Sequence, residues 1–269
     1  MALVGLNEST QHINIMKIAI VLFGQPRDYM KGYNNIMEFI NKQKDCTFDF
    51  FYHTWSLNEN EQYKHCSFRD IKKDSLIFTE KTITHLHELY KPVSCEIQNQ
   101  NELTFDESLY KGTIAYNNTK ESRLHDINNI LFHMYSRNKA RDVFNAYLTK
   151  MGDTVQYDFV LLTRFDIVMM PEVNLCELDT YNTYVSDKFF PRKILPDACI
   201  ITSPQTFLEW FTIYDGLKDI LDNKEVYETM LSMNEYLYMN AEELIFAKYI
   251  FHYKNTDNIS FFRGGVLCY

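Results

Sequence analysis

A charged pair, Arg164 and Asp166, follows directly after the strongly apolar run at residues 157–163. The run predicts a buried strand, and two charges at its carboxyl end need a chemical reason. An Asp at such a place can hold a divalent cation that bridges two phosphates of a nucleotide. Arg164 can neutralise phosphate or hold the Asp. The alternative is a structural ion pair that caps the sheet, and we favour the functional interpretation.

A second polar segment follows the apolar run at residues 17–23, which also predicts a buried strand. Gly24 lets a ligand approach the backbone, Gln25 lies in the same turn, and Arg27 offers a planar guanidinium group to phosphate. Ligands of open α/β sheets bind at the carboxyl ends of the strands. An ordinary turn with a surface arginine explains the same residues equally well.

His53 and Trp55 stand at the end of a third predicted strand, residues 48–54. A His and a Trp at a strand end can stack on a base or line a sugar pocket. Taken alone, they are better explained as a satisfied buried imidazole and a side chain that fills the core.

Two acidic positions are candidates for proton transfer. Asp197 precedes the predicted strand 198–202, where it could act as a general base toward a hydroxyl or satisfy the amides of a turn. Glu242 and Glu243 begin a predicted helix, where acids interact favourably with the helix dipole. One of them, with Glu243 preferred, could instead face a ligand-binding cleft and take part in a reaction with an acceptor molecule.

Composition limits the class of protein. The chain has 269 residues, a formal net charge of −9 and 46% hydrophobic residues, which excludes a disordered chain or a collagen-like repeat. The acidic balance argues against nucleic acid as a partner but leaves small phosphates open. No run of residues is apolar enough for a membrane span, and no cysteine pair has zinc-site spacing. We therefore expect a cytoplasmic protein.

The elements that must position these residues form one α/β domain over residues 16–269, preceded by a leader or disordered N-terminus at residues 1–15. Strand 17–23, a helix over 29–41 and strand 48–54 predict a βαβ unit. Residues 98–122 are expected to form a long loop. The other predicted strands are 75–78, 93–97, 157–163, 181–186, 198–202 and 259–262. The other predicted helices are 83–90, 123–151, 204–221, 224–231 and 241–252.

Taken together, the segments resemble a family of bacterial and large-virus glycosyltransferase-like proteins that build surface glycans. The family's segments are a strand with a Ser-Gly-Gln-x-Arg-like turn, a Phe-Ile-His-Thr-Trp-like segment, a Tyr-Asp-x-Val-x-x-x-Arg-x-Asp segment, an Asp-led stretch ending in Ser-Pro, and an acid-led helix. Their counterparts here are residues 22–27, 51–55, 157–166, 197–204 and 242–244, in matching order and spacing over about residues 16–255.

The resemblance implies a GT-A-like fold, a Rossmann-related mixed sheet flanked by helices with a helical C-terminal part. It implies a hexosyl- or pentosyltransferase that moves a sugar from a nucleoside-diphosphate sugar to a hydroxyl of a glycan acceptor. GT-A enzymes hold Mn²⁺ or Mg²⁺ against the diphosphate with an Asp-x-Asp motif. Here Arg164 stands in place of the first acid. Two alternatives follow: Asp166 is the metal ligand on its own, or Arg164 replaces part of the charge of the metal.

The expected donor site comprises Gly24, Gln25, Arg27, His53, Trp55, Arg164 and Asp166. Asp197 or Glu243 would remove the acceptor proton, which fits an inverting displacement. Two other classes compete with this hypothesis. A Rossmann-type methyltransferase or dehydrogenase would carry a GxGxxG turn, which the segment after residue 23 lacks. A non-catalytic nucleotide- or glycan-binding module would bind the same ligands without turnover.

Overall fold

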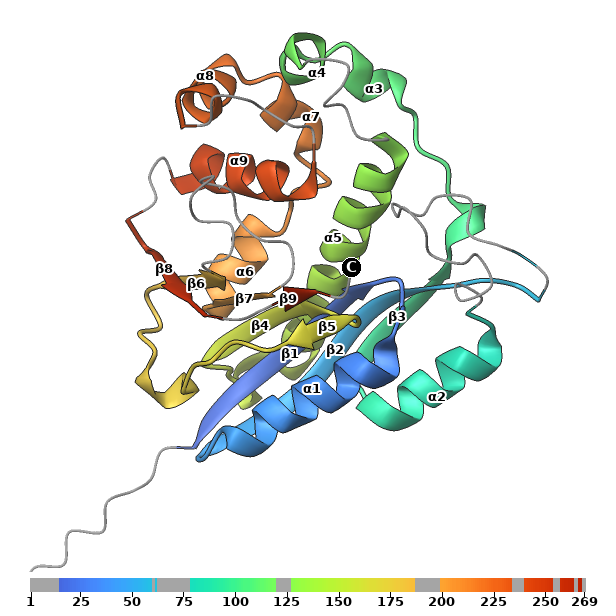
Figure 1. The fold of residues 1–269 in the computed structure, drawn as a ribbon, viewed down its shortest axis with the longest axis vertical. Helices are drawn as coiled ribbons and strands as arrows, with labels where there is room; N and C mark the ends of the chain where they lie inside the picture. The colour runs from blue at the N-terminus through green and yellow to red at the C-terminus, as the bar shows by residue number, and fades with distance from the viewer. Residues whose placement is uncertain are drawn as a thin grey trace, which may run out of the picture.

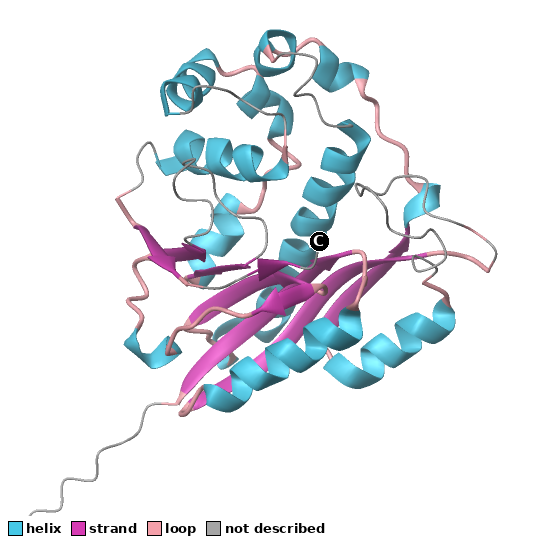
Figure 2. Cartoon of the chain, in the orientation of Figure 1, coloured by secondary structure: helices cyan, strands magenta, loops and turns pink. Residues whose placement is uncertain are grey.

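A seven-stranded sheet forms the centre of the computed structural model, which describes residues 15–59, 61, 78–119, 127–186, 199–233, 240–253, 257–263 and 266–267. The strand order is β3-β2-β1-β4-β7-β6-β8 (Figures 1 and 2). Its strands are β1 (Met16–Gly24), β2 (Cys46–Ser56), β3 (Ser94–Asn99), β4 (Phe159–Arg164), β6 (Thr183–Ser186), β7 (Cys199–Thr202) and β8 (Ile259–Phe262). A second, two-stranded sheet pairs β5 (Ile167–Met169) with β9 (Val266–Leu267).

The sheet is mixed. β3, β2, β1 and β4 run parallel to one another, and β7 runs antiparallel to both of its neighbours, β4 and β6. β8 pairs with β6 in parallel. The first strand, helix and second strand therefore form the predicted parallel βαβ unit.

β1 shows why the sheet lies inside the molecule. Its successive side chains point to opposite faces, and both faces are apolar. The two sets are Ile18, Ile20 and Leu22 in one cluster and Ala19, Val21 and Phe23 in the other, each at most 1% exposed.

Helices cover both faces of the sheet (Figure 1). α1 (Tyr29–Lys42) and α2 (Glu80–Tyr90) pack on one face, and the long α5 (Ile127–Met151) packs on the other. The C-terminal part adds α6 (Pro204–Trp210), α7 (Leu217–Leu221), α8 (Lys224–Met233) and α9 (Ala241–Tyr253). The predicted α/β class, with a mixed sheet flanked by helices and a helical C-terminal part, is confirmed.

Two of the predicted elements were wrong in detail. Residues 98–122 contain the end of β3, the turn η2 (Gln100–Glu102), α3 (Ser108–Lys111) and α4 (Ile114–Asn118), rather than a long loop. The predicted helix 204–221 is divided into α6 and α7. Residues 1–14, most of the predicted strand 75–78, the start of the predicted helix 123–151 and Asp197 lie outside the described residues.

Candidate functional site

The carboxyl ends of β1, β2 and β4 lie next to one another, in register, at one edge of the sheet. Phe23 of β1 is paired with His53 of β2 on one side and with Arg164 of β4 on the other. Because these strands are parallel, the segments that follow them leave the sheet at the same edge. The register thus brings the three polar segments of the sequence to one place.

A pocket that opens to solvent lies at this edge and encloses a volume of about 60 Å³. Gly24, Gln25, Arg27, Trp55 and Arg164 from the predicted donor site line it. The other residues that line it are Phe23, Gln100, Asn129, Phe132 and His133.

Asp166 holds two arginine side chains beside this pocket. Arg164 donates to it from Nε to Oδ1 over 2.9 Å and from Nη2 to Oδ2 over 2.7 Å. The Nη2 atom of Arg27 lies 3.3 Å from Oδ2. The side chains of Arg164, Arg27 and Asp166 are only 12%, 13% and 4% exposed. Bidentate, charge-assisted bonds of this kind fix the guanidinium groups relative to the carboxylate.

Close packing on α1 positions the turn that carries Asp166. A Cβ atom on Gly32 would lie 1.7 Å from the carbonyl oxygen of Phe165, so only glycine allows this approach. One turn further along α1, Asn35 Nδ2 donates to the carbonyl oxygen of Ile167 over 2.9 Å. The backbone on both sides of Asp166 is therefore held against α1.

A buried hydrogen-bond relay, Gln98–His53–Ser136, holds the turn at Gly24. The Gly24 N–H donates to Ser136 Oγ over 2.8 Å, and His53 Nδ1 lies 2.7 Å from the same oxygen. His53 Nε2 lies 3.0 Å from Gln98 Oε1. An amide oxygen only accepts, so Nε2 carries the proton and Nδ1 accepts from the Ser136 hydroxyl. Gly24 itself has φ +93°, a conformation that favours glycine.

His53 therefore lies behind the pocket and does not line it. Its ring is fully buried, and burial lowers its pKa to about 3, with a smaller effect from the charge of Lys139. A neutral imidazole with both nitrogens bonded fits a structural role. The structure gives it contact with the Gly24 turn through Ser136 rather than with a ligand.

Trp55 lines the pocket as a wall, with little of its surface exposed. The residue is 2% exposed, and its ring stacks on Tyr135 with the centroids 5.8 Å apart and an interplanar angle of 22°. The His53 ring meets it edge-on at 4.7 Å. Tyr135 covers one face, and the Phe132 ring meets Trp55 edge-on with the centroids 5.6 Å apart, so the indole ring offers a base almost no surface for stacking.

α5 contributes polar residues that the sequence analysis missed. Asn129 and His133 line the pocket, and Arg137 is buried one helical turn beyond His133. The Arg137 guanidinium lies 4.4 Å from the centre of the Phe23 ring, a cation–π contact. The spacing of His133 and Arg137, four residues apart on one helix face, is the signal that could have indicated them.

The charges around this pocket favour an anion. Burial lowers the pKa of His133 well below its usual value, and the charges of Arg137, Arg164 and Arg27 lower it further, so the ring is neutral. The described charges that act on His133 are those of three arginines, and two of these arginines contact the carboxylate of Asp166. Clustered guanidinium groups in a largely buried site are suited to phosphate.

The described residues do not fit a divalent cation at Asp166. Both of its carboxylate oxygens accept from Arg164, and Arg27 contacts one of them. Within the described ranges, no three His, Cys, Asp or Glu side chains converge to form a metal site. A hard divalent cation needs several oxygen ligands, and positive neighbours oppose it.

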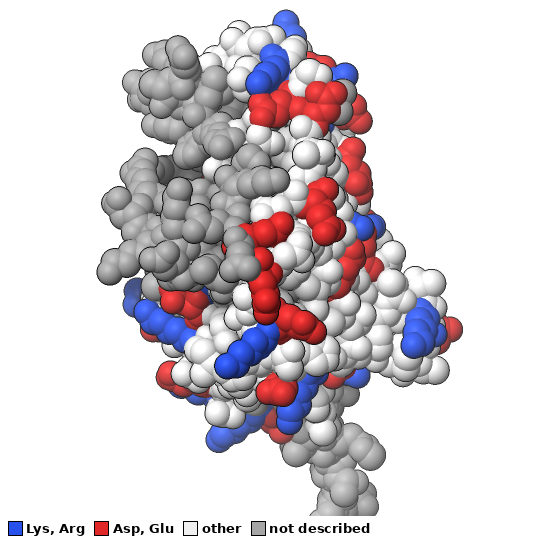
Figure 3. All heavy atoms as spheres, turned by 90° about the vertical axis from the view of Figure 1, so that its right-hand side faces the viewer, with Lys and Arg blue, Asp and Glu red and all other residues white. Residues whose placement is uncertain are grey.

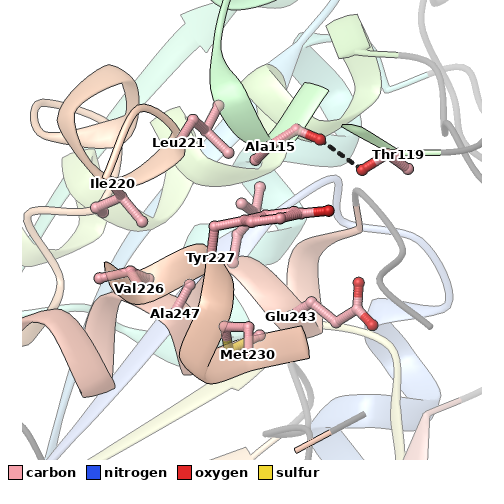
Figure 4. A pocket seen from close by; sticks show the side chains of 10 residues that line it. Ala115, Thr119, Ile220, Leu221, Val226, Tyr227, Met230, Glu243 and Ala247 are labelled. Atoms are coloured by element: carbon pink, nitrogen blue, oxygen red, sulfur yellow. Dashed lines mark hydrogen bonds between the residues drawn. The ribbon is translucent and has the colours of Figure 1, made fainter. Parts of the chain in front are cut away.

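Glu243 lies in a different pocket, between α4, α7, α8 and α9 (Figure 4). This second pocket encloses a volume of about 40 Å³ and has a mostly apolar lining that includes Ile220, Val226 and Met230. Glu243 is 4% exposed, and its N–H donates to Asn240 Oδ1 over 2.8 Å at the start of α9. The structure does not bring Glu243 together with the donor-site residues.

Asp197 lies outside the described residues, but the strand that follows it is informative. β7 starts at Cys199, which is paired with Thr163, the residue before Arg164 in β4. β7 therefore enters the sheet at the edge where the arginine cluster lies.

One face of the molecule carries many acidic side chains. On the described part of the face in Figure 3, acidic side chains gather over the upper and middle regions. None of the helices in the described ranges has the length and apolar character needed to cross a membrane.

Comparison with known proteins finds distant structural alignments. Two solved structures of LgtC, one an active-site mutant and one the galactosyltransferase with donor and acceptor sugar analogues, align with a TM-score of 0.38 and 7% identity. Both alignments cover 91% of this chain, and they cover 72% of the mutant LgtC chain and 73% of the LgtC chain with the sugar analogues. No protein-family model and no curated protein sequence matches. Likeness at this level specifies neither a donor nor an acceptor.

Proposed function

We propose that this chain is a GT-A-like glycosyltransferase that moves a sugar from a nucleoside-diphosphate sugar to a hydroxyl of a glycan acceptor. The observation that carries the proposal is the arginine cluster beside a pocket at the level ends of β1, β2 and β4. A site of this kind suits a ligand with two phosphates and a ring system, because the cations and the pocket walls lie side by side.

On the donor side, Arg27 and Arg164 would bind the diphosphate and stabilise the charge that develops on the leaving group. Gln25 and Gln100 line the same pocket, and Gln25 Nε2 donates to Gln100 Oε1 over 3.1 Å. These amides offer hydrogen bonds to the polar parts of a nucleoside. Gln25 is the more exposed of the two amides, while Gln100 and Trp55, each 2% exposed, would support it from behind.

On the acceptor side, we assign the general base to Asp197. Support comes from the register of β7, which enters the sheet opposite the end of β4. In the proposed step, the acceptor oxygen bonds to the anomeric carbon while the carbon–oxygen bond to the diphosphate breaks. The hydroxyl proton passes to Asp197, which would give inversion. Glu243 has no part in this proposal because it lines the other pocket.

A thermal-shift screen of nucleoside-diphosphate sugars tests the donor site. A bound donor raises the unfolding temperature by mass action, and Arg27→Gln should lose most of this shift. Arg263→Gln is the matched control, because Arg263 is exposed and does not line the pocket. The assignment of the donor site is refuted if no donor raises the unfolding temperature of the wild type, or if Arg27→Gln shows the same increase as the wild type.

Turnover is tested separately with Asp197→Asn. We expect this variant to keep the thermal shift with the donor and to lose transfer to acceptors and donor hydrolysis. Full activity in Asp197→Asn would remove it from the mechanism. Donor binding by the wild type with no turnover against a broad panel of acceptors would instead support a non-catalytic binding module.

A further inference from the structure

We infer that Arg27 and Arg164, held by Asp166, take the place of a divalent cation at the diphosphate, so that donor binding needs no metal. This inference rests on the proposed function and specifies how the same site meets the charge of its ligand. It reverses the role expected for Asp166 from an Asp-x-Asp motif. The carboxylate positions two cationic side chains instead of ligating a cation.

The geometry of the carboxylate is the first argument. Arg164 approaches it edge-on with bonds of 2.9 and 2.7 Å, one to each oxygen, and Arg27 adds a contact of 3.3 Å. A metal ion at Asp166 would have to displace at least one of these donors. The displaced guanidinium group would then remain beside a divalent cation of like charge.

The burial of the three groups is the second argument. Each of their side chains is less than 15% exposed, so little water screens their charges. Breaking a buried ion pair by withdrawing one partner leaves an uncompensated charge, which is strongly unfavourable. A bound cation would add this cost, whereas an anion beside the arginines would lower the repulsion between them.

The neighbouring groups on α5 are the third argument. Arg137 is buried on α5, and its charge acts on the same His133 ring as the charges of Arg27 and Arg164, so it adds a third positive charge that opposes a metal ion at the pocket. Asp166 uses two of the five N–H groups of Arg164, which sets the plane of that guanidinium group. A planar donor of fixed orientation recognises phosphate oxygens as a metal ion would, by direct charge-assisted contact.

The experiment measures binding of UDP, GDP, CDP and dTDP to the full chain by calorimetry, in EDTA and in Mg²⁺ or Mn²⁺. For the nucleotide that binds, we expect affinities within about twofold of each other in all three conditions. An affinity that falls about tenfold or more in EDTA and returns with Mn²⁺ would overturn the inference while leaving the proposed function intact. If none of the four binds under any condition, the proposed function itself fails and this inference with it.

Two variants separate the roles of the residues. Arg164→Lys keeps a positive charge but loses the planar edge, and we expect it to weaken nucleotide binding by about tenfold or more, equally in EDTA and in Mn²⁺. Asp166→Asn should also weaken binding equally in both. Loss of binding by Asp166→Asn in Mn²⁺ alone, with EDTA values unchanged, would show that Asp166 is a metal ligand. Urea unfolding of each variant, with Arg263→Gln as control, checks that the fold is kept.

Discussion

Acid should destabilise this chain through His53, the middle residue of the relay behind the Gly24 turn. The folded chain holds the ring neutral, since burial lowers its pKa to about 3 from an ordinary value of 6.5. Between these two values the unfolded chain binds the proton and the folded chain does not. Stability contributed by His53 is therefore complete above pH 6.5 and is lost as the pH falls toward 3.

The size of the effect follows from the same pKa difference. One pKa unit corresponds to about 1.4 kcal/mol, and the proton equilibria of the two states give a loss of about 2 kcal/mol between pH 7 and pH 5 from His53 alone. The ring is fully buried, so water does not screen this contribution. His133, also buried with a lowered pKa, adds a loss of the same sign.

The assay is urea unfolding at pH 7 and pH 5, followed by tryptophan fluorescence. The pH-dependent loss of unfolding free energy in the wild type should exceed that in His53→Gln by about 2 kcal/mol, because the variant has no ring to protonate. His85→Gln, at an exposed histidine, controls for the loss of a histidine as such. The same pH dependence in His53→Gln and in the wild type would refute the reasoning.

Three further predictions concern backbone and thiols. Gly24→Ala should cost about 1–2 kcal/mol of unfolding free energy, because φ is +93° there. Gly32→Ala should cost about 2 kcal/mol or more and weaken nucleotide binding, because the new Cβ would lie 1.7 Å from the Phe165 carbonyl oxygen. Hydrogen peroxide should join Cys46 and Cys176, whose Sγ atoms are 3.8 Å apart, into a disulfide that peptide mapping detects.

Each of these has a result that contradicts it. An Ala at residue 24 with wild-type stability would mean that the turn relaxes without strain. Unchanged stability and binding in Gly32→Ala would show that α1 and the Phe165 turn separate easily. For the thiols, Cys176→Ser is the control, and a peroxide-treated wild type that keeps both thiols would contradict the expected pairing.

Much of the fold could be predicted because its strongest patterns are local. β1 and β4 are apolar runs of one strand's length, and α1 follows a turn with helical periodicity. The prediction failed where elements are short or are paired over long distances. α3 and α4 have only 4 and 5 residues, too few for a periodic pattern, and α4 begins with a cap, Thr113, whose hydroxyl accepts from Tyr116. β5 and β9 are joined only by tertiary pairing across the chain.

The residues of the candidate site could also be predicted only where a local pattern indicates them. Gly24 and Arg164 end β1 and β4, and Arg27 and Asp166 follow within three residues, so the parallel register of the strands was enough to bring them together. The contributions of α5 could not be predicted, because that helix is buried around much of its circumference and its polar residues mark no single exposed face. His53 was expected in the donor site, but the structure places its ring behind the pocket, in contact with Ser136, which is 83 residues away in the sequence.

The contact between Gly32 and the carbonyl oxygen of Phe165 has a consequence for motion. It joins the helix that follows Arg27 to the turn that carries Asp166, so neither can shift without the other. The conformational entropy of aligning the guanidinium groups is therefore lost when the chain folds, and a ligand meets them already aligned. Any closure over a bound ligand must come from elements other than α1 and this turn.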